Sequence, residues 1–528
     1  MIAGWRGCQY CEARVARPIS LTAKIGTGAM PRSDPRRWVD MDDETVEIAG
    51  DLRIAVPDSV ELITSYVLRE QERWFEDEWG FVPTLLEAGA NVVDIGANYG
   101  AYTLPMARAI GGGGRLWAFE PTSTTAQHLA KSIELNGLTN VSLVEAALSD
   151  HTGTGTLALH KNSELNSLTS VGPLGGQKVT LKTLDQCRAE LGWEEIAFVK
   201  MDAEGEEANI LRGGRVFLSA ESPLVMFELK HGQAVNLPLI DAFAQFECRP
   251  YRLVPGLQLL VPFEVGEDPD PYQLNLFCCK GDRAAKLAAA GFLVSCTDST
   301  EEVPVPGVPI EKTKWISLPF AQRLEGVIGA SRRARSEPDT QEHIRAIELF
   351  YGAHRPEAPP SHRYAALHRA FSTLQALCSG GEHMARLSTF ARVAWSLGRR
   401  GVAVEAISKA LMVIQRTQAV TLDEPFLPAC PRFDDMDPAG RVAEWLVTSL
   451  LEQLEVLRAF SSYYTGPHSL ANLEQLKALG FQHAEMERRR QLVRMRMGEQ
   501  QAPEPSPVLA TKSPSNLNPE YWNQGDRS

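Results

Sequence analysis

The stretch Val-Val-Asp-Ile-Gly-Ala-Asn-Tyr-Gly, residues 92–100, decides the fold of this chain. It begins as an apolar strand, turns through Gly96 and Gly100, and leads into a helical pattern around Tyr102–Ala109. Glycine lets the backbone turn sharply and approach a ligand closely. In an open parallel sheet, ligands bind at the carboxyl ends of the strands. The stretch therefore predicts a parallel α/β sheet with a ligand site at this turn.

Short apolar strands alternate with helices on both sides of this turn. We expect five strands at Asn91–Ile95, Arg115–Phe119, Val141–Glu145, Ile196–Met201 and Leu224–Glu228. Such alternation indicates a parallel sheet that is covered on both faces. Tyr251–Val254 and Leu274–Cys279 follow without a helix between them and are expected to pair antiparallel. The sequence predicts a Rossmann-like sheet of seven strands, with extra strands at Thr156–His160 and Val179–Leu181.

The turn after the first strand also indicates the kind of cofactor. A nicotinamide dinucleotide site uses a Gly-x-Gly-x-x-Gly loop that brings backbone amides to a pyrophosphate. Here the glycine spacing differs, and the carboxylate of Asp94 at the mouth of the loop would repel a diphosphate. An acid at this place suits a cofactor that carries an ammonium and a sulfonium, which is S-adenosylmethionine. We expect Asp94, Gly96, Asn98 and Gly100 to belong to its site.

Further cofactor contacts are expected from the next two strands. Glu120 ends the second strand, where a carboxylate can accept hydrogen bonds from both ribose hydroxyls. Ala147 ends the third strand and is placed to flank the adenine. Asp150 could accept from the adenine amino group, but a turn-forming role before Thr152 and Gly153 is equally consistent with the sequence.

The fourth strand ends in Lys-Met-Asp-Ala-Glu-Gly-Glu, residues 200–206, at the same edge of the sheet. Methyl transfer is an in-line displacement, so a methyltransferase must hold the acceptor oxygen near the methyl group and remove its proton. We predict Asp202, which also contacts the cofactor, followed by Glu204 and Glu206, as catalytic residues. In the alternative, Glu206 caps the following helix and Lys200 pairs with an acid. His231, after the fifth strand, is a candidate base, although a lone loop histidine is more often solvated.

Together these residues resemble the FkbM family of methyltransferases. The resemblance rests on residues 92–104, Phe-Glu-Pro at 119–121, Ala-Ala-Leu-Ser-Asp at 146–150, Asn-Ser-Leu at 166–168, Lys-Met-Asp-Ala-Glu-Gly-Glu-Glu at 200–207, Leu211 with Gly213, and Phe-Glu-Leu at 227–229. It implies a Rossmann-like fold, S-adenosylmethionine as the methyl donor, and O-methylation of sugars or secondary metabolites. Ala203 departs from the family pattern, in which a branched aliphatic residue is expected.

Composition limits the other possibilities. Of 528 residues, 44% are hydrophobic and 23% charged, with a net charge of −13 and no sustained basic stripe, so we expect no nucleic-acid partner. No apolar run approaches the roughly 18 residues of a membrane span. Nine scattered cysteines favour a reducing compartment, and we predict a cytoplasmic location. Cys8 and Cys11 form a lone CxxC without partners, and we predict no metal site.

The second half of the chain differs in character. Residues 297–315 are rich in Pro, Glu and Val and are interpreted as a linker. Beyond it we expect amphipathic helices at Tyr364–Leu377, Arg386–Leu397, Ala403–Ile414, Val442–Phe460 and Leu470–Leu479. Residues 394–411 resemble the turn of a tetratricopeptide-like hairpin, without a clear repeat period. The predicted organisation is a flexible leader (1–37), a methyltransferase domain (38–296), the linker (297–315), a helical domain (316–500) and a disordered tail (501–528).

The sequence thus favours an S-adenosylmethionine-dependent O-methyltransferase acting on a hydroxyl of a sugar, glycan or secondary metabolite. The helices would bind a protein partner or a large acceptor. In the alternative, a non-catalytic methyltransferase fold serves only as a scaffold for the helices. A nicotinamide-dependent enzyme is disfavoured by the loop at residues 94–100.

Overall fold

The computed structural model describes residues 43–163, 166–168, 175–231, 234–264, 269–294, 307–330, 337–481 and 483–499. The predicted leader and tail, the CxxC of Cys8 and Cys11, and the Pro-rich first part of the predicted linker lie outside these ranges.

The first half of the chain forms an eight-stranded mixed sheet with the strand order β14-β13-β15-β10-β9-β3-β4-β5. Its strands are β3 (Asn91–Ile95), β4 (Arg115–Phe119), β5 (Val141–Val144), β9 (Ile196–Met201), β10 (Leu224–Glu228), β13 (Arg249–Val254), β14 (Leu259–Pro262) and β15 (Asn275–Cys279). The strands from β10 to β5 are parallel, and β15, β13 and β14 are antiparallel to their neighbours. The predicted fold class is confirmed. The sheet has eight strands rather than seven because β14 folds back on β13 and extends the edge.

Helices cover both faces of this sheet, as the alternation of strands and helices predicts. Val92 packs in one hydrophobic cluster with helices α2 (Asp77–Leu85), α3 (Thr103–Ile110), α4 (Ser123–Leu135) and α9 (Gly281–Ala289). Its neighbour Val93 packs in the other, with α5 (Leu184–Leu191), α6 (Glu207–Gly213), α7 (Arg215–Ala220) and α8 (Pro238–Ala244). Successive residues of a strand point to opposite faces, so one apolar run can supply two cores.

The strand order places a ligand site at the end of β3. From β3 the chain continues to β4 and β5 on one side, and later returns to β9 and β10 on the other. The order therefore switches between β3 and β9. Loops that leave two such strands diverge to opposite faces and leave a crevice between them, which is where ligands bind in open α/β sheets.

Smaller sheets and one more helix flank the main sheet. They are the hairpin of β1 (Asp43–Ile48) and β2 (Leu52–Pro57), a three-stranded sheet of β6 (Ala147–Leu148), β8 (Gly176–Lys182) and β7 (Gly153–Ala158), the short pair β11 (Lys230–His231) and β12 (Ala234–Val235), and helix α1 (Ile63–Gln71). The predicted extra strands therefore exist, in a sheet separate from the main one.

The second half is helical, as predicted. It comprises α10 (Pro319–Ala330), α11 (Pro338–Ala353), α12 (Pro360–Ser379), α13 (Met384–Ser396), α14 (Arg400–Thr417), α15 (Val442–Leu457), α16 (Ser462–Thr465), α17 (Leu470–Leu479) and α18 (Ala484–Arg496), with 3-10 turns at Ile310–Lys312, Lys314–Ser317, Pro431–Phe433 and Gly466–Ser469. The predicted hairpin at residues 394–411 is formed by α13 and α14. No helix in the described ranges is both long and apolar enough to cross a membrane.

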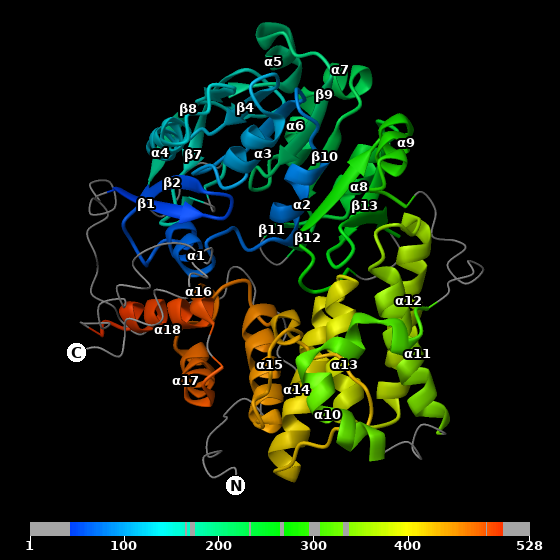
Figure 1. Cartoon of the computed structure of the whole chain (residues 1–528). Helices are drawn as coiled ribbons and strands as arrows, with labels where there is room; N and C mark the ends of the chain where they lie inside the picture. The colour runs from blue at the N-terminus through cyan, green and yellow to red at the C-terminus, as the bar shows by residue number, and fades with distance from the viewer. Residues whose placement is uncertain are drawn as a thin grey trace.

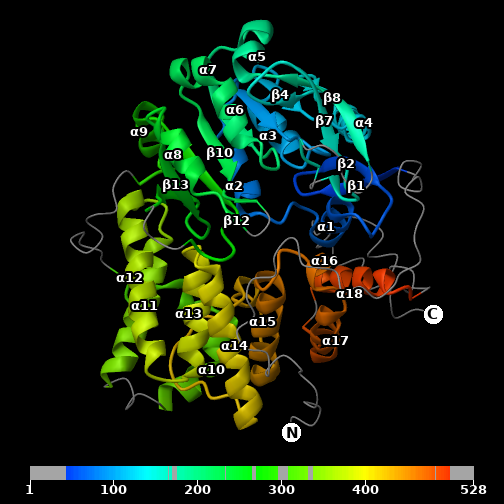
Figure 2. The ribbon, with the colours of Figure 1, turned by 180° about the vertical axis from the view of Figure 1, so that it is seen from behind.

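The described parts of the two halves touch at several places, of which two bear most on the site (Figures 1 and 2). Val254 and Leu259, from the edge strands β13 and β14, belong to the same hydrophobic cluster as the helices α11 to α15. Between these strands, the Gly256 amide donates to the Ser396 carbonyl of α13 (2.9 Å). The second contact joins α1 to α16 and α18. The domain boundaries predicted from the sequence remain a proposal. These contacts join segments that lie on either side of the proposed linker in the sequence.

Candidate active site

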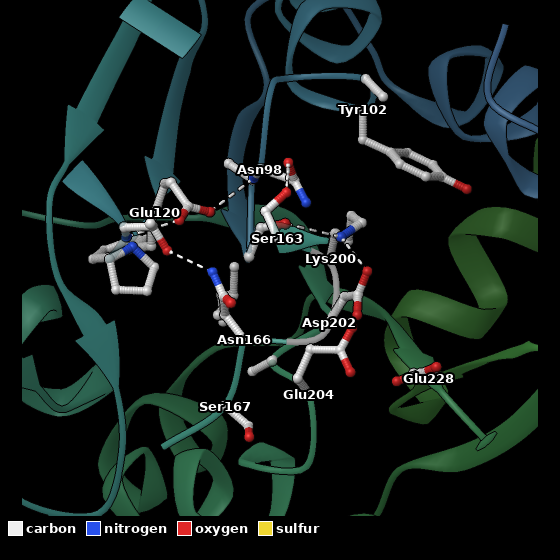
Figure 3. A pocket seen from close by; sticks show the side chains of 18 of the residues that line it. Asn98, Tyr102, Glu120, Ser163, Asn166, Ser167, Lys200, Asp202, Glu204 and Glu228 are labelled. Carbon is white, nitrogen blue, oxygen red and sulfur yellow. Dashed lines mark hydrogen bonds and ion pairs between the residues drawn. The ribbon is translucent and has the colours of Figure 1, made fainter. Parts of the chain in front are cut away.

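A cavity of about 380 Å³ lies at the carboxyl edge of the parallel strands, at the switch in strand order. Residues from the ends of β3, β4, β9 and β10 line it, together with α1, the segment before α2 and one residue of α16. Among the predicted site residues, the lining includes Gly96, Asn98, Glu120, Ala147, Asp202, Glu204 and Glu206. The topology thus gathers side chains from strands that are far apart in the sequence (Figure 3).

The turn after β3 lies directly against the end of β9. Gly96 has a φ of +76°, and a Cβ at this position would lie 1.8 Å from the carbonyl oxygen of Asp202. The Asp202 amide also donates to the Ile95 carbonyl (3.2 Å). Only glycine fits this position, both for its backbone conformation and for its space. The backbones of the two predicted site segments are therefore in contact at the centre of the cavity floor.

Asp94 lies beneath this floor and is fully buried. The Thr103 hydroxyl donates to its Oδ2 (2.6 Å), and Lys200 Nζ lies 3.8 Å from its Oδ1. Lys200 Nζ also donates to Asp202 Oδ2 (3.0 Å) and to the Gly96 carbonyl (3.4 Å). Lys200 does pair with acids, as the alternative interpretation held, and it joins the β3 turn to the end of β9.

Burial raises the pKa of Asp94, and the charge of Lys200 opposes this shift. Burial alone lowers the pKa of Lys200, but Asp202 and Asp94 together raise it above its ordinary value, so the lysine stays protonated. Asp94 itself does not line the cavity. Its carboxylate reaches the cavity lining only indirectly, because Lys200 lies between Asp94 and the β3 turn.

Glu120 lies on the opposite side of the cavity from Asp202 (Figure 3). Its Oε2 accepts from the Asn98 amide (3.0 Å) and its Oε1 from the Thr122 amide (2.8 Å). Burial raises its pKa to about 7 despite these hydrogen bonds. Each carboxylate oxygen has a second lone pair that can accept a ligand hydroxyl. The carboxylate is thus held in one orientation toward the cavity.

Asn98 closes the β3 turn in a left-handed conformation (φ +49°), which asparagine tolerates better than most residues. Its Oδ1 accepts from the Tyr99 amide (2.8 Å) and from the Ser163 hydroxyl (3.2 Å). Gly100, one turn later, lies against Leu129 of α4 and does not line the cavity. The role of Gly100 in this structure is to allow close packing of the turn on the helix.

The predicted adenine side contains Ala147 and Leu148, and Asn166, Ser167 and Leu168 of the resemblance motif line the same cavity. Asn166 Nδ2 donates to the Thr122 hydroxyl (3.3 Å), which joins this segment to the Glu120 loop. Asp150 is exposed, and its carboxylate pairs with His151 (2.7 Å) and Arg212 (3.3 Å) outside the cavity lining. Neither the adenine contact nor the turn-forming role of Asp150 is tested by these side-chain contacts, and both stay predictions.

The loop after β9 carries the three predicted catalytic acids. Glu204 has a φ of +49°, uncommon for a residue with a side chain, and such strain concentrates at functional sites. Buried Glu207 holds the loop, because its Oε1 accepts from the Ala203 (3.0 Å) and Gly205 (3.3 Å) amides. Glu206 precedes α6 without capping it.

Glu206 lines the cavity, and one of its two carboxylate oxygens, Oε2, is hydrogen-bonded within the protein. It accepts from the Asn209 side chain (2.6 Å) and from the Ser149 hydroxyl (3.1 Å). The side chain that holds the loop through its backbone amides is that of Glu207, which was not among the predicted site residues.

Two further acids in the cavity lining lie outside the predicted catalytic set. Glu228 ends β10 beside Asp202, and burial together with the charges of Asp202 and Glu204 raises its pKa well above the ordinary value. Glu76, before α2, accepts from the Tyr102 hydroxyl (2.5 Å), and burial raises its pKa as well. The position of Glu228 at a strand end was a usable signal, whereas nothing in the local sequence marks Glu76. The side chain of His231 is not described. No group of three metal-ligating residues is present in the described ranges.

The comparisons with known proteins give a family match within the first half of the chain. Residues 94–247 match the family described as "Methyltransferase FkbM domain", so the predicted resemblance is confirmed and the chain contains such a domain. The chain is similar to the methyltransferase FkbM of Methylobacillus flagellatus (18% identity, 39% of this chain, 48% of that chain, TM-score 0.28). The aligned part thus spans about half of that protein.

Two O-methyltransferases of known structure are also similar. One is from Thermotoga maritima (13% identity, 45% of this chain, 77% of that chain, TM-score 0.23). The other is from Bacillus cereus in complex with SAH (15% identity, 38% and 78%, TM-score 0.22). No curated protein matches the sequence.

Proposed function

We propose that this protein is an S-adenosylmethionine-dependent O-methyltransferase acting on a hydroxyl of a sugar, glycan or secondary metabolite. The observation that carries the proposal is the acidic cavity at the switch in strand order, with Glu120 on one side and Asp202, Glu204 and Glu228 on the other. Glu76 and Glu206 line the cavity as well, and six acidic residues at one site repel a diphosphate and attract a cation when they are ionised. S-adenosylmethionine carries two cationic groups and no phosphate.

The residues present fit this cofactor. Glu120 is placed to accept from both ribose hydroxyls, with Ala147 and Leu148 along the adenine. The β3 turn, from Gly96 to Asn98, and Asp202 would hold the methionine part. When bound, the cofactor supplies an activated methyl group on its sulfonium. Buried Asp94 keeps Lys200 charged and in position.

The proton of the acceptor hydroxyl needs a base at the same edge. Asp202, Glu204 and Glu206 are the predicted catalytic residues there, and Glu206 also accepts hydrogen bonds from the Ser149 hydroxyl and the Asn209 side chain. Glu228 adds a carboxyl whose pKa is raised by burial and by Asp202 and Glu204, and it can accept the proton only in its ionised form. We propose that one of these carboxylates receives the proton as the oxygen–methyl bond forms.

Calorimetric titration with S-adenosylmethionine, S-adenosylhomocysteine and NAD tests the cofactor. Binding of the first two and none of NAD is expected; tight NAD binding alone would overturn the proposal. Transfer of tritiated methyl groups to a panel of methyl glycosides and aromatic alcohols tests the reaction, with Asp202→Asn as the inactive control. Cofactor binding without transfer to any hydroxyl would favour the scaffold alternative. A cytoplasmic location and a protein partner for the helices remain proposals.

A further inference from the structure

The cavity is longer than the part assigned to the cofactor. Three strand spacings separate Glu120 on β4 from Glu228 on β10. Neighbouring strands lie about 4.8 Å apart, so the two carboxyls are separated by roughly 14 Å across the sheet. β15, where Leu274 and Asn275 line the cavity, lies one strand further. The end of the cavity at β10 and β15 is therefore available to the acceptor.

This end of the cavity has one apolar wall. Ile63, Trp74, Phe75, Leu274 and Tyr464 line it, and they pack against one another in a single hydrophobic cluster. Glu76, Asp202, Glu204 and Glu228 line the same cavity. An acceptor bound here meets apolar surface on one side and proton-accepting groups on the other.

Tyr464 is the member of this wall that comes from the C-terminal half of the chain. It lies on the short helix α16, and its ring packs edge-on to Tyr463 (centroids 5.5 Å apart), which packs in the same way on Tyr66 of α1 (5.5 Å). Just before α16, Phe460 packs on Phe75 (5.1 Å). The aromatic wall is thus continuous across the two halves.

A buried charged network holds this segment in place. Glu70 of α1 is fully buried and accepts from the Ser461 hydroxyl (3.0 Å) and the Ser462 amide (3.1 Å). Arg489 of α18, only 1% exposed, pairs with Glu70 (3.2 Å). Removing either partner of such a pair leaves an uncompensated buried charge, so the arrangement is strongly determined. The same helix α1 supplies Ile63 and Thr64 to the cavity.

We propose that the segment Phe460–Tyr464 completes the acceptor end of the cavity and that Tyr464 provides an aromatic surface on which the acceptor packs. This inference rests on the proposed function. It implies an acceptor with an apolar or aromatic face next to the hydroxyl that is methylated. Tyr464 is then a specificity-determining residue, and the helical half of the chain belongs to the active site.

Thiol labelling tests the position of Tyr464 without an identified acceptor. In a background with Cys8, Cys11 and Cys296 replaced by serine, the six remaining cysteines are buried. Tyr464→Cys, at the acceptor end, is compared with Ala147→Cys, at the cofactor end, by iodoacetamide labelling with and without saturating S-adenosylhomocysteine. We expect the ligand to slow labelling of Ala147→Cys about tenfold or more, and that of Tyr464→Cys less than about twofold.

Nitration of the unaltered chain by tetranitromethane gives the same information if Tyr464→Cys folds poorly. Tyr464 should be nitrated with or without S-adenosylhomocysteine, whereas Tyr66, which has no exposed surface, should not. With a competent acceptor from the methyl-transfer panel, Tyr464→Ala should raise its KM about tenfold, since an aromatic contact is lost, while Tyr464→Phe should not. Lys477→Ala, an exposed substitution on α17, is the matched control.

The outcomes separate the two proposals. If S-adenosylhomocysteine does not bind the parent protein, the proposed function fails. If it binds but Tyr464 stays unmodified in the unaltered chain, or is protected by the ligand as strongly as position 147, the inference about Tyr464 is overturned. An acceptor KM that is unchanged in Tyr464→Ala would overturn it as well.

Discussion

Replacing Lys200 by methionine should destabilise the protein far more than an ordinary lysine substitution does. Methionine keeps the length of the side chain and removes its charge. The ammonium lies 3.8 Å from Asp94 Oδ1 and 3.0 Å from Asp202 Oδ2, and the Asp94 side chain has no exposed surface. Without Lys200, Asp94 becomes a buried carboxyl without a counter-charge. Asp202 is 38% exposed and can be solvated instead.

The magnitude follows from the burial of this pair. Breaking a buried ion pair by removing one partner costs about 3–5 kcal/mol. For domains of this size, each kcal/mol lowers the melting temperature by about 2–4 °C, so a decrease of roughly 6 °C or more is expected. The effect should depend on pH. With its pKa raised in the folded state, Asp94 binds its proton more tightly there than in the unfolded chain, where the ordinary value is 3.8. The stability that Lys200→Met loses relative to the unaltered protein is therefore smallest at acidic pH. This loss grows as the pH rises toward the pKa of Asp94 in the folded state.

Differential scanning calorimetry of three variants checks this reasoning. Lys178→Met, an exposed lysine on β8, controls for the loss of a lysine. The double variant Lys200→Met/Asp94→Asn removes both charges and should recover much of the lost stability. The argument is refuted if Lys200→Met melts like Lys178→Met, or if the double variant is no more stable than Lys200→Met.

Three further predictions follow from the site and the domain contacts. Burial raises the pKa of Glu120 to about 7, and the ionised form of Glu120 is the better acceptor for ribose hydroxyls. The affinity for S-adenosylmethionine should therefore increase between about pH 6 and pH 8. In calorimetry, Glu120→Ala should weaken binding about tenfold and abolish this pH dependence. Asp202→Asn should leave melting nearly unchanged and strongly reduce methyl transfer, so near-normal turnover would exclude a catalytic role. A chain ending at Pro304 should still bind the cofactor and melt cooperatively. Its melting temperature should be lower, because Val254 and Leu259 are no longer covered by the C-terminal helices. Aggregation or loss of cofactor binding would show that the two halves form one cooperative unit.

Much of the fold could be predicted because its determinants are local. Asn91–Ile95, Arg115–Phe119 and Ile196–Met201 are strands at the predicted residues, since apolar runs of this length between turn signals have few other structures open to them. The pairing of β13 with β15 was also predicted, whereas β14 was missed. Four apolar residues after a tight turn carry little periodic signal, so only the neighbouring strand determines that Leu259–Pro262 joins the sheet.

The candidate site was predictable only in part. The positions of Gly96, Glu120 and Asp202 at strand ends follow from the sequence, because the carboxyl ends of parallel strands share one edge. The sequence does not show which way the side chains point. Asp94 is buried under Lys200, and Asp150 pairs with Arg212 on the surface, because neighbouring elements supply their partners.

By itself the sequence determined the strand–turn–helix units, the sharp turn at Gly96, and the row of acids at one sheet edge. Only the tertiary structure decided which distant segments close the cavity. Glu70 and Arg489 meet because α1 and α18 each bury a charge that the other neutralises. Through that contact Tyr464 reaches the cavity, although no local pattern connects it with the strands of the sheet.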